Sequence, residues 1–83
     1  MRIEIYLSDG EVVRTRIEIE EHEDEEKIME NAARNMMEHI SKTGFVCIPE
    51  SGGHRAINGD EIKEIIIISD EKEMRIIADE EEK

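Results

Sequence analysis

The segment IMENAARNMMEHI, residues 28–40, repeats its apolar side chains at spacings of three and four residues. The apolar set is Ile28, Met29, Ala32, Ala33, Met36, Met37 and Ile40. This spacing gives a helix a single apolar stripe that packs against a core. Asp24 is the predicted N-cap, and Gly44 is the predicted left-handed stop. The sequence therefore predicts one amphipathic helix of about 18 residues, which is about 27 Å long.

In the chain before this helix, apolar side chains recur at every second residue, which is typical of half-buried strands. Apolar and polar side chains alternate in residues 2–7 and again in residues 13–19. A three-residue loop with Gly10 in the left-handed conformation would pair Ile5 with Val13. A two-residue turn would instead set Ile5 opposite an arginine and mix charge into the apolar face. We therefore predict an antiparallel hairpin in the first of these registers.

Four shorter extended segments follow the helix, at residues 45–48, 54–57, 65–69 and 74–78. Pro49 is expected to end the first of them, and Asp60 is expected to cap one helical turn before the third. The predicted order is β-β-α-β-β-β-β. This order predicts an α+β fold in which one amphipathic helix packs on a mostly antiparallel sheet. We expect residues 1–78 to form one domain and residues 79–83 to be a charged C-terminal tail.

Composition restricts the function further. A chain of 83 residues builds one modest core and leaves little room for a deep cleft. Its net charge of −12 repels nucleic acid and anionic membranes and attracts basic surfaces. Tyr6 and Phe45 are the only aromatic residues, too few for a base-stacking surface. Direct nucleic-acid binding is therefore not expected, and no apolar run is long enough to span a membrane.

The residue types that usually build catalytic or metal sites are few and scattered. A single cysteine, Cys47, excludes an internal disulfide and fits a reducing, cytoplasmic location. Its position in a short apolar strand predicts a buried thiol. His22, His39 and His54 fall in three different segments, so they form no metal-binding pair along one helix. We therefore predict no enzymatic activity, no cofactor and no fixed metal site.

Acidic residues are concentrated in IEIEEHEDEEK, residues 17–27. The seven acids between positions 18 and 26 are Glu18, Glu20, Glu21, Glu23, Asp24, Glu25 and Glu26. The run contains no glycine, unlike the calcium loop of an EF-hand. The helix dipole favours the acids of its first turn, which leaves the earlier glutamates without a structural role. The run is either a solvated entrance to the helix or a surface for a basic partner, and we predict these seven as partner-binding residues.

In size, acidity and lack of enzyme motifs, the chain resembles small phage-encoded inhibitors, including anti-CRISPR proteins and DNA mimics. The resemblance is one of general character and transfers no functional residue. It implies a non-enzymatic inhibitor whose carboxylates occupy a site where a basic partner normally holds phosphates. The expected partner is a basic protein, with nucleic-acid-binding proteins as the commonest case.

The last strands have apolar residues at consecutive positions, which places apolar side chains on both faces of the sheet. A single helix covers only one of these faces. Either the sheet curls into a partial barrel or a second copy of the chain covers the other face. For the second case we predict a homodimer face of Ile66, Ile68 and Ile76. The corresponding alternative function is a homodimeric structural or regulatory module.

Overall fold

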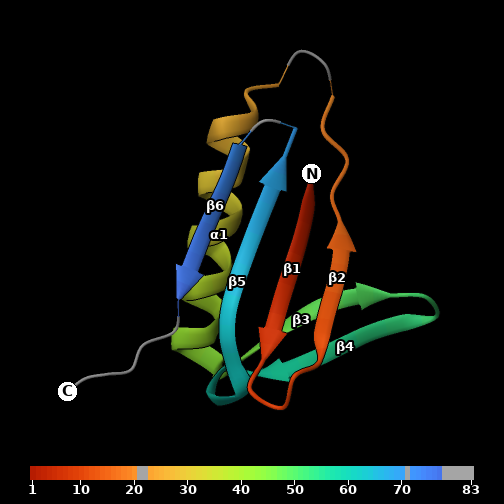
Figure 1. Cartoon of the computed structure of the whole chain (residues 1–83), viewed down its shortest axis with the longest axis vertical. Coiled ribbons are helices and arrows are strands. Elements are labelled where there is room, and N and C mark those ends of the chain that lie inside the picture. The colour runs from red at the N-terminus through yellow and green to blue at the C-terminus, as the bar shows by residue number, and fades with distance from the viewer. Residues whose placement is uncertain (21–22, 71, 78–83) are drawn as a thin grey trace.

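The computed structural model describes residues 1–20, 23–70 and 72–77 (Figure 1). Its elements are β1 (Arg2–Leu7), β2 (Val12–Arg16), α1 (Glu25–Thr43), β3 (Phe45–Glu50), β4 (Gly53–Asn58), the 3₁₀ turn η1 (Gly59–Glu61), β5 (Ile62–Ser69) and β6 (Lys72–Ile77). The predicted α+β class and the order β-β-α-β-β-β-β are confirmed. The predicted charged tail, residues 79–83, lies outside the described residues.

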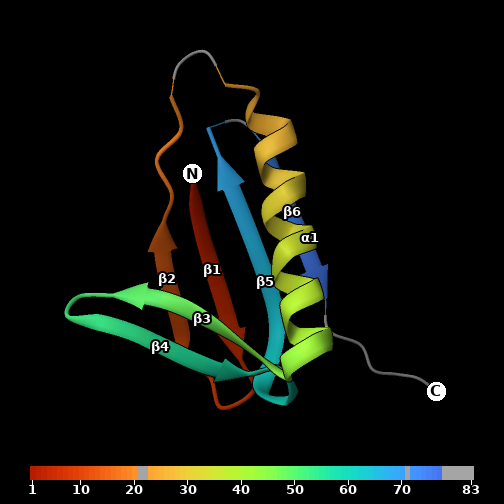
Figure 2. The same cartoon turned by 180° about the vertical axis from the view of Figure 1, so that it is seen from behind.

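The strands form two separate antiparallel sheets. One has four strands in the order β2-β1-β5-β6, and the other is the β3-β4 hairpin. Helix α1 and this hairpin lie on the same face of the four-stranded sheet (Figure 2). We call the opposite face of that sheet the open face. The hairpin crosses the part of this face that α1 does not cover, so the helix and the hairpin cover the face together.

The first hairpin has the predicted register. Ile5 pairs with Val13, and Gly10 adopts a left-handed φ of 97°. β2 ends at Arg16, earlier than the predicted residue 19. Met1 and Ile17 still exchange two backbone hydrogen bonds of 2.8 and 3.0 Å, after which residues 18–20 run beyond the end of β1. The end of pairing frees this segment to turn toward the helix.

Both predicted caps of α1 are confirmed. The Asp24 side chain accepts hydrogen bonds from the backbone amides of Glu26, at 3.1 Å, and Lys27, at 3.3 Å. Gly44 adopts a left-handed φ of 88°, and its amide donates to the Ile40 carbonyl at 2.8 Å. These contacts satisfy backbone groups that an uncapped helix would leave without a partner. The helix therefore begins and ends where local sequence chemistry places it.

The core lies between the four-stranded sheet and the layer formed by α1 and the hairpin. Its buried residues are Ile3, Ile5, Leu7, Val13, Ile62, Ile65 and Ile67 from the sheet, Met29, Ala33 and Met36 from the helix, and Val46, Ile48 and Ile57 from the hairpin. Ile5 and Ile67, at the centre of the sheet, are fully buried at 0% exposure. All of these side chains are aliphatic, so the core depends on close packing of branched residues and methionines.

Two predictions about β3 are wrong. Cys47 is exposed, because Val46 and Ile48 face the core and a strand turns every second side chain the other way. Pro49 does not end the strand but pairs with His54 inside it. Proline is tolerated there because, among the described strands, β3 pairs only with β4 and its other edge needs no amide donor.

The prediction that Asp60 caps the short helical turn is also wrong. Asn58, not Asp60, is its N-cap, and the Asn58 side-chain oxygen accepts from the Asp60 amide at 2.9 Å. The predicted helical turn therefore starts earlier in the chain, and β5 begins at Ile62 instead of residue 65. Because β5 is longer than expected, it reaches back to pair with Leu7.

Candidate functional site

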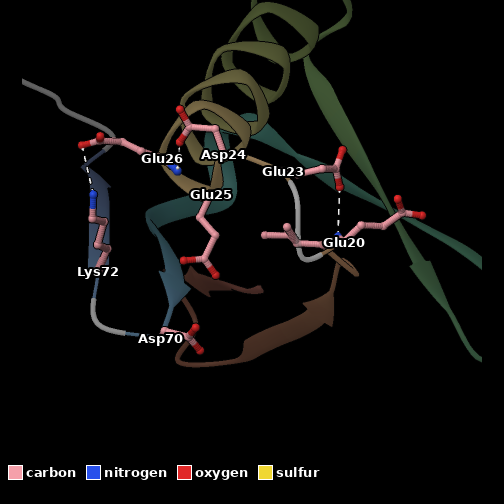
Figure 3. Close-up of a pocket in the computed structure, with 8 residues that line it drawn as sticks. Glu20, Glu23, Asp24, Glu25, Glu26, Asp70 and Lys72 are labelled. Atoms are coloured by element: carbon pink, nitrogen blue, oxygen red, sulfur yellow. Dashed lines mark hydrogen bonds and ion pairs between the residues drawn. The ribbon is translucent and has the colours of Figure 1, made fainter.

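Acidic side chains from three separate segments lie around one hollow (Figure 3). They come from the chain between β2 and α1, from the first turn of α1, and from the β5–β6 turn. Together they line an open hollow of about 580 Å³. We call its acids the acidic end: Glu20, Glu23, Asp24, Glu25, Glu26 and Asp70. Five of the seven predicted partner-binding residues are thus brought together with an acid from a distant part of the sequence.

Part of the acidic end is needed to build the start of the helix. Asp24 is occupied as the N-cap. The Glu23 side chain accepts a hydrogen bond from the Glu20 amide at 3.0 Å, and the Glu23 amide donates to the Glu20 carbonyl at 3.0 Å. The expectation that Glu23 has no structural role is therefore wrong. These bonds join Glu20 to Glu23 immediately before the start of α1.

Glu25 joins the helix to the sheet. Its half-buried carboxylate accepts a hydrogen bond from the Ser69 hydroxyl at 2.8 Å. Ser69 is only 3% exposed and is the last residue of β5. A hydrogen bond to a charged acceptor in such a position contributes about 1.5 to 3 kcal/mol. This contact fixes the helix N-terminus against the end of the sheet and so holds the acidic end in place.

Glu26, which also lines the hollow, pairs with Lys72 of β6. The Lys72 Nζ and Glu26 Oε2 atoms are 3.4 Å apart, and both side chains are more than half exposed. An ion pair this open to water contributes only about 0 to 1 kcal/mol. Among the described residues that line the hollow, Lys72 is the only base. Glu26 therefore remains available to a stronger cationic partner.

Two of the predicted acids are not placed in this hollow. Glu18 lines a neighbouring hollow of about 880 Å³ together with Arg2 and Arg16. Glu21 lies outside the described residues. Glu20 lines both hollows, so Glu18 is next to the acidic end but on the far side of Glu20.

Asp70 belongs to the acidic end but was not among the predicted residues. It follows β5 directly and adopts a left-handed φ of 40°, a conformation that aspartate tolerates better than most residues. The sequence signal was an acid in a tight turn after a buried strand. That signal does not show that the turn lies beside the start of α1, because the distance depends on how the helix crosses the sheet.

The acidic end presents negative charge without a chelating geometry. Within residues 1–20, 23–70 and 72–77, no group of three or more His, Cys, Asp or Glu side chains is arranged to hold a metal ion. Its carboxylates instead bind backbone amides, the Ser69 hydroxyl and the Lys72 ammonium group. What this arrangement can do chemically is attract and orient cationic groups.

The predicted dimer residues do not share a surface. Ile76 is directly opposite Ile65 and lies on the helix-facing side of the sheet. Ile66 lies on the open face, where its direct cross-strand neighbours are Glu4 and Arg75. Ile66 is already 6% exposed within one chain. The apolar patch of Ile66, Ile68 and Ile76 therefore does not exist, because alternation sends Ile76 to the opposite face.

The open face is instead organised around a shared carboxylate. Glu4, which is 8% exposed, accepts from the Tyr6 hydroxyl at 2.9 Å and from Arg14 Nε at 3.2 Å. It also lies 3.3 Å from Arg2 Nε. The Tyr6 hydrogen bond, followed by the two arginines, lowers the pKa of Glu4 below its ordinary value even though burial opposes the shift. The same hydrogen bond raises the pKa of Tyr6.

The lowered pKa predicts a specific loss of stability in acid. A carboxyl whose folded pKa is depressed stabilises the fold above its unfolded pKa, near 4.5, and loses that contribution as the pH falls through the folded value. Glu4→Gln should therefore lower the free energy of unfolding at pH 7, and the difference from wild type should shrink below about pH 4. Urea unfolding followed by circular dichroism across this range checks the prediction. A constant difference at every pH would contradict it.

The described chain has no helix long and apolar enough to cross a membrane. Comparison of the sequence and structure with protein-family models, curated proteins and solved structures gave no match.

Proposed function

We propose that the protein is a small, acidic, non-enzymatic binding protein that occludes a basic partner with its acidic end. The observation that supports this proposal is that carboxylates from three chain segments line one open hollow, where Lys72 is the only base among the described lining residues. Folding by itself requires only some of these acids. Asp24, Glu23 and Glu25 have structural contacts, whereas Glu26 and Asp70 add exposed charge at the same place.

The mechanism would be steric and electrostatic occlusion. Arginines and lysines that normally hold nucleic-acid phosphates would meet the carboxylates of the acidic end, so the preferred partner is a nucleic-acid-binding protein or complex. The cap at Asp24 and the Glu25–Ser69 bond would keep these carboxylates in place before binding, which reduces the ordering cost of association. The step requires no bond cleavage and no cofactor. This is the mode that the resemblance to phage-encoded anti-CRISPR proteins and DNA mimics implies, and it fits a cytoplasmic location.

The proposal predicts a strong dependence on ionic strength. The immobilised protein should capture strongly basic proteins from a cell lysate at about 50 mM salt and lose most of them at about 300 mM, because exposed charge pairs are screened. Mass spectrometry of the two eluates identifies the partner. An identical set of captured proteins at both salt concentrations, without enrichment in basic proteins, would be inconsistent with the proposal.

A further inference from the structure

The four-stranded sheet has an exposed edge at β6. Among the described strands, β6 pairs only with β5, so the outer side of its backbone has no neighbouring strand. Its side chains alternate between the two faces. Glu73 and Arg75 lie on the open face, whereas Met74 lies on the helix-facing side. An unprotected edge of this kind is a template for pairing with another strand.

The two edges of this sheet differ in their charge pattern. On β2, the charged residues of the open face are Arg14 and Arg16, both positive. Pairing β2 with a second β2 in registers that overlap these residues brings arginines together. On β6, a negative residue and a positive residue occupy the corresponding positions. A second β6 can therefore offer the opposite charge to each of them.

We infer that two copies of the protein form a symmetric dimer by antiparallel pairing of their β6 strands, with the two-fold axis at Met74. In this register Glu73 of each copy lies opposite Arg75 of the other, so the attractive pair occurs twice. Moving the axis by one residue sets Arg75 opposite Arg75 or Glu73 opposite Glu73. Residues opposite one another in an antiparallel pair lie on the same face, so the helix layers of the two copies also meet on one side.

The surroundings of β6 favour the same partner. A groove of about 400 Å³ lies between α1 and β6, and the described residues that line it include no charged side chain. Met37 and Ile77, at 53% and 71% exposure, are the most exposed large apolar residues described, and both line this groove. In a chain of 41% charged residues, an uncharged strip beside an open strand edge marks a contact surface.

Antiparallel pairing also limits repulsion between two chains of net charge −12. β6 begins at Lys72 beside the acidic end and runs away from it (Figure 1). The proposed axis therefore places the two acidic ends at opposite ends of the paired strands. Both ends stay uncovered, so this inference does not depend on what the acidic end binds.

Sedimentation of the whole chain between about 10 and 500 µM tests the dimer at low and moderate salt. Arg75→Glu and Glu73→Arg each set like charges opposite one another twice, and each should raise the dimer Kd about 10-fold to 100-fold. The double variant Glu73→Arg/Arg75→Glu restores opposite charges and should recover most of the affinity. Arg16→Glu, on the other edge strand, is the matched control and should leave the dimer unchanged.

The dependence on salt concentration distinguishes the proposed dimer from the proposed capture of a basic partner. Screening weakens the repulsion between two highly acidic copies, so dimerisation should strengthen with salt whereas capture of a basic partner weakens. Far-UV circular dichroism confirms that each variant is folded. A monomer at every concentration and at both salt levels would overturn the dimer. Single reversals without effect, or a double variant without recovery, would overturn the pairing of β6 about Met74.

Discussion

Replacing Glu18, Glu20 and Glu26 together by lysine is expected to weaken binding of the captured basic partner at least about 100-fold at low salt. These three exposed glutamates lie in or next to the hollow of the acidic end. The substitutions leave the Asp24 cap and the Glu25–Ser69 hydrogen bond intact, so the fold should persist. Each reversal replaces an attraction by a repulsion, and about 1 kcal/mol for each gives the expected total. Isothermal titration with the identified partner measures the effect.

A matched control distinguishes the acidic end from net charge. Lysine at Glu38, Glu50 and Glu61 removes the same amount of negative charge from exposed positions elsewhere on the molecule. This variant should lose less than about fivefold in affinity, because charges beyond the contact act only through screened long-range attraction. If both triple variants lose affinity equally, total charge and not the acidic end drives binding, and the assignment of the site is wrong.

Ile67→Ala is expected to lower the free energy of unfolding by about 3 to 4 kcal/mol. Ile67 is 0% exposed and lies in the core between the sheet and the layer of α1 and the hairpin. Its removal leaves a cavity whose lining is held by strands and a helix on several sides, so the site cannot collapse fully. A small domain has only about 5 to 15 kcal/mol in total, so this loss is a large fraction of the stability. Urea unfolding followed at 222 nm by circular dichroism provides the measurement.

The neighbouring residue is a control of the same type. Ile66 is 6% exposed but faces the other way, between Glu4 and Arg75 on the open face. Ile66→Ala should cost only about 1 to 2 kcal/mol, because long charged side chains and water can occupy the vacated space. Equal losses for the two variants would show that the open face is packed as tightly as the core, contrary to the one-sided arrangement described above.

Local chemistry in the sequence was sufficient for much of the fold. The helix begins after Asp24 and stops at Gly44 because side-chain and left-handed caps act over a few residues. The register of the first hairpin followed from Gly10 and the alternation of apolar residues. The exposure of Cys47 could also have been predicted, since the alternation around it already points the thiol away from the core.

The candidate site could be predicted only in part. The run from Glu18 to Glu26 marked the acidic region, but the sequence did not show that Asp70 and Ser69 would lie beside it. The sequence also suggested that Ile66 and Ile76 share one surface, but the register between β5 and β6 places them on opposite faces of the sheet. These errors share a cause, because each concerns residues that come together only through the pairing of β5 with β1 and β6.

The sequence by itself determined the elements and their order, because periodicity and capping act within a few residues of the chain. Tertiary structure decided that β5 lies between β1 and β6, that the β3-β4 hairpin joins α1 over the core, and that the acids gather at one end. Such arrangements depend on which distant apolar surfaces bury one another most completely. This burial depends on packing across the whole domain, so no local stretch of sequence determines it.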